Sequence, residues 1–237
     1  MPAATRSVVH PDDVEPTWEG SAEVRVTLDE ANGCELLEQR ILRIPRGRSA
    51  ERTPNGRHEL LYVVAGRGTL GLKGGRHALE PETGAFVAEG ETYAVDADDE
   101  LTLLSVLVPA EERPEASRKV TVRFADQPEL RATSKRTFRY LVSSEIGCTD
   151  ATQFLGIVQP SKEGLHSHPY EEVGYIVEGD GVAHIDGEET PLRTGSCFHL
   201  APAQVHTIES SGPEPMRIVG VFSPAGSPAA RLDPDNN

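Results

Sequence analysis

The chain has 237 residues, a formal net charge of −15 and 37% hydrophobic residues. Such an acidic surface repels nucleic acids and anionic membranes, so we expect neither as a partner. No run of about eighteen apolar residues occurs and the N-terminus lacks an apolar signal-like segment, which makes a cytoplasmic location the default expectation. Cys34, Cys148 and Cys197 are odd in number and far apart, which predicts buried thiols rather than a disulfide framework.

Short apolar runs separated by turn residues extend over most of the chain. Residues 1–21 are rich in proline and acidic side chains, and we expect an arm that frays or packs across a neighbouring surface. Over 22–112 the turn signals recur about every ten positions, which predicts an all-β unit. Residues 113–137 begin with a polar, proline-containing stretch typical of a linker. The β pattern returns over 138–225, and residues 226–237 have so little to bury that we expect a mobile tail.

An internal repeat relates the two β units. The segment ELLYVVAG at 59–66 matches EVGYIVEG at 172–179, with an offset of 113 positions. The same offset carries Tyr93 to His206. Two copies of one all-β unit, each about 90 residues long, explain this correspondence better than chance.

The second copy contains the residues suited to chemistry. His166 and His168 are two positions apart, so on a β-strand their imidazoles project to the same side, roughly 6.6 Å apart along the chain. Two imidazoles at this spacing can bind one metal ion. Glu172 keeps the same parity, and His206 is the candidate for a fourth ligand.

These residues resemble the two motifs of the cupin superfamily, and their tandem setting resembles a bicupin. The first motif, G(X)5HXH(X)3–4E(X)6G, is matched at His166, His168, Glu172 and Gly179. The second motif, G(X)5PXG(X)2H, is matched more loosely up to His206, because Ala201 and Ala203 stand where its proline and glycine usually are.

The resemblance implies an all-β fold of two tandem jelly-roll barrels, also called double-stranded β-helices. It also implies that the C-terminal barrel binds one divalent transition metal through His166, His168, Glu172 and His206. Iron or manganese is favoured, and nickel, cobalt, copper and zinc suit the same ligands. Four protein ligands would leave two positions of a six-coordinate ion open to a small-molecule substrate.

The N-terminal copy lacks this ligand set. Applying the offset places Thr53, Asn55, Glu59 and Tyr93 at the four ligand positions. Neutral hydroxyl, amide and phenol groups are poor substitutes for imidazoles at a transition metal. His58 has the opposite parity to Glu59, so we expect it to face away and to be exposed. We therefore predict an N-terminal barrel without a metal.

Three further side chains are candidates for a supporting catalytic role near the metal, namely Tyr170, His184 and His199. Tyr170 follows the ligand turn and would either line the mouth of the barrel or cover it. The two histidines lie on predicted strands, where the alternative is an ordinary packed or surface group. Glu171 should point away from the site and be exposed, whereas Gly174 shares the parity of Glu172 and should leave room beside the metal.

The expected function is that of a metal-dependent bicupin enzyme acting on a small organic molecule. Dioxygenase-type chemistry is the leading hypothesis, and a redox-neutral isomerase, lyase or decarboxylase at the same metal is the alternative. A non-catalytic bicupin that binds a small molecule through its metal is the competing class. Exposed barrel edges invite pairing, so a homodimer is compatible with this fold.

Overall fold

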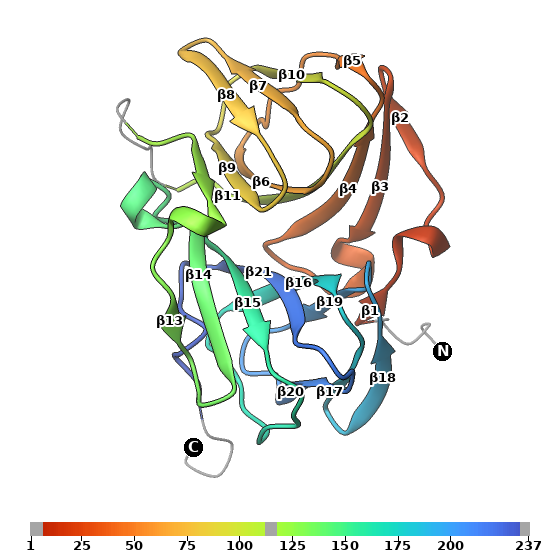
Figure 1. Cartoon of the computed structure of the whole chain (residues 1–237), viewed down its shortest axis with the longest axis vertical. Helices are drawn as coiled ribbons and strands as arrows, with labels where there is room; N and C mark the ends of the chain where they lie inside the picture. Colours follow the sequence, from red (N-terminus) through yellow and green to blue (C-terminus); the bar gives the residue numbers. More distant parts are fainter. Residues whose placement is uncertain (1–6, 112–117, 233–237) are drawn as a thin grey trace.

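The computed structural model describes residues 7–111 and 118–232 (Figure 1). Its two halves are antiparallel β-barrels, one above the other in Figure 1. The predicted fold of two jelly-roll barrels is therefore confirmed. The described part of the chain has no helix that is long and apolar enough to cross a membrane.

The N-terminal barrel consists of a seven-stranded and a four-stranded sheet. The larger sheet contains, in spatial order, β12 (Thr121–Arg123), β9 (Thr83–Val87), β6 (Arg57–Ala65), β11 (Leu101–Pro109), β4 (Glu38–Ile44), β3 (Ala22–Leu28) and β2 (Thr17–Glu19). The smaller sheet contains β5 (Gly47–Arg48), β10 (Tyr93–Ala97), β7 (Gly68–Leu72) and β8 (Gly75–Leu79). Alternate residues of these strands point inwards and form an apolar core between the sheets.

The C-terminal barrel repeats this plan with a seven-stranded and a three-stranded sheet. The larger sheet contains β1 (Val8–Val9), β19 (Cys197–Leu200), β16 (Glu171–Glu178), β21 (Met216–Ser223), β15 (Thr152–Val158), β14 (Arg136–Val142) and β13 (Leu130–Arg131). The smaller sheet contains β18 (Glu188–Leu192), β17 (Gly181–Ile185) and β20 (His206–Ser210). The described residues include four short 3-10 helices, and two of these are η1 (Pro11–Asp13) and η3 (Phe124–Asp126).

The other two 3-10 helices show the repeat in the backbone. Helix η2 (Glu30–Asn32) and helix η4 (Ser144–Ile146) each begin after a residue whose side chain accepts a hydrogen bond from the first turn. Each ends at a left-handed glycine, Gly33 with φ 90° and Gly147 with φ 95°. Only glycine adopts this conformation at little cost, so the two copies share a turn as well as a strand pattern.

The two larger sheets pack against each other, and one apolar core lies between the two barrels. Leu60, Tyr62 and Phe86 of the first barrel belong to the same buried cluster as Val173 and Val219 of the second. The three cysteines are buried and free, as predicted. Because the barrels share a core, each covers an outer sheet face of the other.

His58 and Glu171 occupy equivalent positions of the repeat, and both are buried in this interface, with 2% and 1% exposure. Nε2 of His58 lies 3.1 Å from an oxygen of Asp150, and its Nδ1 accepts a hydrogen bond from the backbone of Glu89. The Glu171 carboxylate accepts hydrogen bonds from the backbone N–H groups of residues 35–37. Both side chains point away from their own barrel interiors as predicted, but the prediction that they are exposed was wrong, because the other barrel covers that face.

The segments outside the predicted barrels join the sheets as well. Strand β1 of the N-terminal arm pairs with β19, and β2 pairs with β3, so the arm contacts both barrels. In the predicted linker, β12 pairs with β9 and β13 with β14. Residues 226–232 also make hydrogen bonds with the C-terminal barrel, which corrects the expectation of a mobile tail there. The end of that predicted tail, 233–237, lies outside the described residues.

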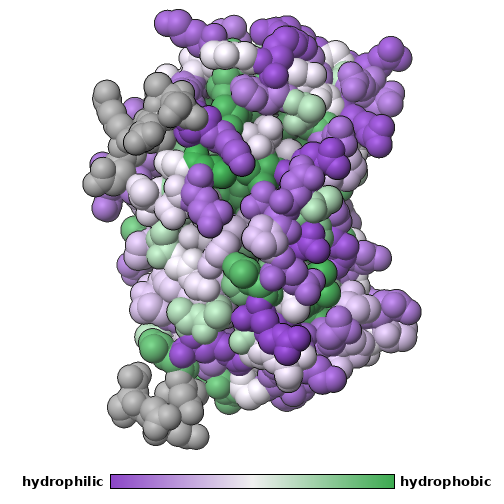
Figure 2. Space-filling model, turned by 60° about the vertical axis from the view of Figure 1, so that its left-hand side comes forward, coloured by the Kyte–Doolittle hydropathy of each residue, from purple (hydrophilic) through white to green (hydrophobic). Residues whose placement is uncertain are grey.

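The surface is mainly polar. On the face drawn in Figure 2, hydrophilic side chains cover most of the molecule and apolar ones show in limited areas. Among the described residues, Trp18 and Leu165 are the large hydrophobic side chains with more than half of their surface exposed. The homodimer stays a prediction.

Candidate metal centre

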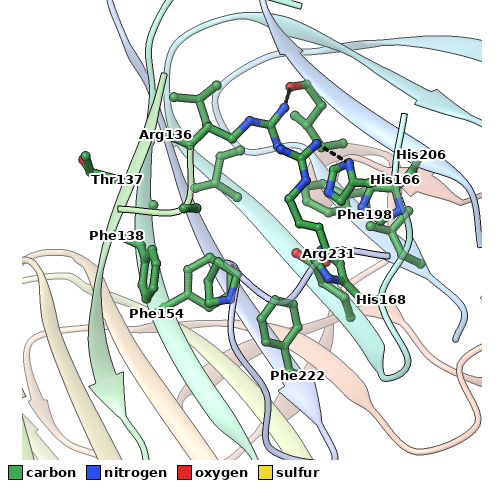
Figure 3. Close-up of a pocket in the computed structure, with 18 residues that line it drawn as sticks. Arg136, Thr137, Phe138, Phe154, His166, His168, Phe198, His206, Phe222 and Arg231 are labelled. Carbon is green, nitrogen blue, oxygen red and sulfur yellow. Dashed lines mark hydrogen bonds between the residues drawn. The ribbon is translucent and has the colours of Figure 1, made fainter. Parts of the chain in front are cut away.

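Three imidazoles meet inside the C-terminal barrel (Figure 3). One ring nitrogen each of His166, His168 and His206 lies within 4.8 Å of the others, and all three residues are buried. Nitrogens about 2.1 Å from one metal ion lie at most about 4.2 Å apart, so this spacing is close to that of ligands around a single ion. The sequence prediction that these three histidines converge agrees with the structure.

Backbone pairing brings the histidines together. The N–H of His166 donates to the carbonyl oxygen of His206 at 3.0 Å, and the reciprocal hydrogen bond is 2.8 Å. The carbonyl oxygen of His168 accepts from the N–H of Ala203 at 2.7 Å. Ala203 has φ 62°, a conformation that favours glycine. The turn of the second motif is therefore retained although alanine replaces its glycine.

Two of the imidazoles are oriented by carbonyl groups. Nδ1 of His168 lies 2.8 Å from the carbonyl oxygen of Ala230, and Nδ1 of His206 lies 2.9 Å from that of Gln204. A carbonyl only accepts, so each Nδ1 carries the proton and each Nε2 has a free lone pair. Such outer partners fix the tautomer that a metal ligand needs.

The third imidazole has a different partner. A guanidinium nitrogen of Arg231 lies 2.7 Å from Nδ1 of His166. Because a guanidinium only donates, neutral His166 here carries its proton on Nε2. His166 can use Nε2 as a ligand only after Arg231 leaves Nδ1.

Glu172 lies in the same cavity but outside the group of three nitrogens within 4.8 Å. The residue is 7% exposed, and no described residue forms a hydrogen bond or ion pair with its carboxylate. Burial raises the pKa of Glu172 to about 8, with Arg136 acting in the opposite direction. A buried carboxylate without a donor is costly to ionise unless a cation balances its charge.

The imidazoles are held neutral by their surroundings. Burial, together with His206 and Arg231, lowers the pKa of His166 to about 2. Burial also lowers the pKa of His206 to about 4 and lowers that of His168. Neutral imidazoles and one carboxylate form a donor set that fits a divalent transition metal.

The histidines open onto a cavity of about 70 Å³. Most of its wall is apolar, and the aromatic rings that line it are Phe138, Phe154, Phe198 and Phe222 (Figure 3). The room expected at Gly174 is taken by Phe198, because a Cβ at Gly174 would lie 2.0 Å from that ring. Gly174 thus makes space for a wall of the cavity and not for a ligand.

Residues 226–232, here called the C-terminal strap, lie across the ligand segment. Ser167 and Leu232 exchange two backbone hydrogen bonds of 3.0 and 2.9 Å. The hydroxyl of Tyr170 donates to the carbonyl oxygen of Ser227. A Cβ at Gly226 would lie 2.2 Å from the Tyr170 ring, so this glycine allows the close approach.

Two arginines in the cavity wall were missed by the sequence reasoning. Arg136 belongs to β14 and Arg231 to the strap, and both line the cavity. They share the carboxylate of Glu163, with distances to one oxygen of 2.8 Å from Nε of Arg136 and 3.3 Å from Nη1 of Arg231. The sequence placed Arg136 at the end of the linker and Arg231 in the tail, and neither position carries a recognisable signal.

The three candidates for a supporting role are not gathered at the cavity. Tyr170 stacks on His168 with ring centroids 5.2 Å apart, but it lies outside the lining. His184 on β17 points to the outer side of the small sheet, with Nε2 2.8 Å from Glu209. His199 faces the other barrel, and its Nε2 lies 2.9 Å from Glu171. The structure therefore gives neither His184 nor His199 a place beside the metal.

His199 and Glu171 form a second potential ligand group with Cys34, within 4.8 Å of one another. The two Glu171 oxygens already accept hydrogen bonds from three backbone N–H groups and from His199. Burial, with the nearby Glu171, raises the pKa of the Cys34 thiol to about 12. These contacts therefore link the two barrels.

In the N-terminal barrel, protein groups satisfy the equivalent carboxylate. Glu59 accepts hydrogen bonds from the hydroxyls of Tyr93 at 2.9 Å and Ser105 at 2.5 Å. A guanidinium nitrogen of Arg52 lies 3.7 Å from Glu59 and supplies the positive charge. Thr53 bonds instead to a neighbouring threonine, and Asn55 is exposed. These contacts support the prediction that this barrel binds no metal.

Comparison with known proteins identifies the family. The Cupin domain family matches residues 154–222, and the AraC-like ligand binding domain family matches residues 39–153. An oxalate-binding protein of Thermotoga maritima is 32% identical over 86 residues, which are 35% of this chain and 71% of that protein. The chain belongs to the cupin superfamily.

Other relatives agree with this assignment. The polyketide synthase CurC of Streptomyces cyaneus is 32% identical to this cupin over 111 residues, 45% of this chain and 72% of that protein. Among solved structures, a mutant of the Bacillus subtilis oxalate decarboxylase has a TM-score of 0.77 at 14% identity, covering 93% of this chain and 78% of that one. At this identity the similarity establishes the two-barrel fold.

Proposed function

We propose that this cupin is a metal-dependent enzyme that acts on a small organic molecule at one mononuclear centre in its C-terminal barrel. The ligands are His166, His168, Glu172 and His206. The proposal depends chiefly on the Glu172 carboxylate. It is buried in the cavity that the three neutral imidazoles line, and no described residue forms a hydrogen bond or ion pair with it. A bound cation would supply the missing partner.

The metal, iron or manganese by preference, would supply two adjacent open positions for the substrate and dioxygen, or act as a Lewis acid. The protein's own residues exclude water with an apolar wall and hold negative charge with two arginines. Besides the four candidate ligands, those arginines are the only ionisable side chains among the described lining residues. Isomerisation or elimination needs a group that gives up and regains a proton, which arginine does not do. This wall therefore favours dioxygenase-type chemistry.

Decarboxylation is the second candidate. Loss of carbon dioxide from a bound acid requires one proton to be delivered, so it makes a smaller demand on the lining residues. The fold similarity to oxalate decarboxylase supports it at the level of architecture. The name of the Thermotoga maritima relative, an oxalate-binding protein, describes the third class, binding without turnover.

Oxygen uptake and carbon dioxide release separate the three classes. Protein loaded with iron or manganese is incubated with small hydroxy-, keto- and catechol-type acids, and both gases are followed. We expect substrate-dependent oxygen uptake that His168→Ala abolishes. Carbon dioxide release without oxygen uptake would establish a decarboxylase instead, and saturable binding with neither gas signal would contradict the enzyme assignment.

A further inference from the structure

The cavity of the proposed metal centre has two chemically different ends. Arg136 and Arg231 lie together at one end, next to His166 (Figure 3). Phe154 and Phe222 lie at the other, with ring centroids 4.9 Å apart. From this asymmetry we infer that the ligand is a small monocarboxylate with an apolar body, whose carboxylate binds the two arginines. The inference rests on the proposed function, because it names the class of molecule bound at that site.

The arginine end has surplus positive charge. Two guanidinium groups, those of Arg136 and Arg231, share one carboxylate, that of Glu163. Nη2 of Arg136 donates to Thr207 and Ile208, but no described residue accepts a hydrogen bond from its Nη1. Guanidinium groups bind carboxylates through paired hydrogen bonds, and such bonds are stronger in a dry site. A carboxylate ligand would balance this charge.

The aromatic end excludes a second charge. Phe138, Phe154, Phe222 and Tyr170 form one buried apolar cluster on this side. A carboxylate placed against the phenylalanine rings would lose its hydration without gaining a hydrogen-bond donor, which disfavours its binding there. A methyl or methylene group in the same place is favoured, because its apolar surface is removed from water. The pocket therefore selects against dicarboxylates.

The volume limits the size of the ligand. A water-sized atom needs roughly 10 to 15 Å³ of such space, so a cavity of about 70 Å³ holds roughly five to seven non-hydrogen atoms. A linear four-carbon acid has six. Butyrate therefore fits the charge, the polarity gradient and the volume together, and it is a suitable probe of the site.

Isothermal titration of the full-length protein with three matched probes tests the inference. Butyramide has the shape of butyrate without its charge, and succinate replaces the methyl end of butyrate by a second carboxylate. We expect one butyrate per chain, with butyramide and succinate each at least about tenfold weaker. If butyramide bound as tightly as butyrate, the arginines would not recognise the carboxylate. If succinate bound as tightly as butyrate or more tightly, the aromatic end would not exclude a second charge.

Variants locate the carboxylate. Arg136→Met and Arg231→Met should weaken butyrate at least about tenfold and leave butyramide unchanged. The exposed Arg193 lies outside the cavity, so Arg193→Met is the matched control and should bind butyrate normally. Unchanged butyrate affinity in both cavity variants would overturn the inference. The comparison of the three probes on wild-type protein stands even where a variant does not fold.

Metal content, measured on the same samples, separates this inference from the proposed function. If the probes showed the expected order of affinity but the protein contained no metal, the inference would be supported and the proposed metal centre would be wrong. If the protein contained metal but the probes did not show that order of affinity, the metal centre would be supported and the inference would be wrong.

Discussion

Replacing His168 with alanine should remove most of the bound metal, whereas replacing Asn55 with alanine should leave the metal content unchanged. His168 is buried beside the other two imidazoles, and the carbonyl of Ala230 holds its Nδ1 so that Nε2 is free to bind. Loss of an outer partner alone costs about 10- to 100-fold in metal affinity, so loss of a ligand should cost at least about 100-fold.

Asn55 is the matched control because it occupies the equivalent position of the repeat. It is exposed, and the carboxylate of the N-terminal barrel already has protein partners. Elemental analysis after dialysis gives the metal content, and circular dichroism checks that both variants are folded. Equal metal loss from the two folded variants would mean that the C-terminal site is not the one that binds.

Metal binding at pH 7 should release about one proton per chain, and that proton should come from Glu172. The pKa of Glu172 is raised to about 8 by burial, so the metal-free protein holds this proton at neutral pH. His166 and His206 have pKa values lowered to about 2 and about 4, so they are already neutral. Affinity should therefore rise about tenfold per pH unit between roughly pH 5 and pH 8 and then level off.

The same shifts set the stability of the metal-free protein. Glu172 has a folded-state pKa above its ordinary value of 4.5, so its contribution is fully present below pH 4.5 and is lost as the pH rises towards 8. The imidazoles act in the opposite sense. Their pKa values are below 6.5, so stability falls as the pH drops below that value and the unfolded chain takes up protons.

Calorimetric titration in buffers with different ionisation enthalpies counts the released protons. Glu172→Gln should bind metal more weakly and release none, because an amide has no proton to lose in this range. Proton release of the same size from Glu172→Gln would show that another group titrates and that Glu172 is not a ligand.

The sequence contained enough information for the barrels and the three histidines. The repeat and the period-two pattern depend on residues close together in the chain, and the motif spacing places His166, His168 and Glu172 on one segment. Parity also predicted correctly that Glu171 and His58 point away from their barrel interiors. The alternation of side chains along a strand does not show what covers the outer face of the sheet. Here the other barrel covers it, so Glu171 and His58 are both buried.

The arginine end of the cavity could not be predicted from local sequence patterns. Arg136 lies in what resembled a linker, and Arg231 in a segment rich in Gly, Ser, Pro and Ala that has few apolar side chains to bury. Apart from Arg231, the C-terminal strap bonds to the barrel through its own backbone N–H and C=O groups, which leave no trace in a hydrophobicity pattern. These two arginines meet only because long-range folding brings β14 and the strap to one carboxylate.

Anomalous X-ray diffraction from crystals of the natively purified protein, recorded at the absorption edge of the metal found by elemental analysis, tests the central claim most directly. The account predicts one strong peak per chain, inside the C-terminal barrel and within bonding distance of His166, His168, Glu172 and His206. Absence of a peak there, or a peak at Glu59 or between Cys34 and His199, would contradict it.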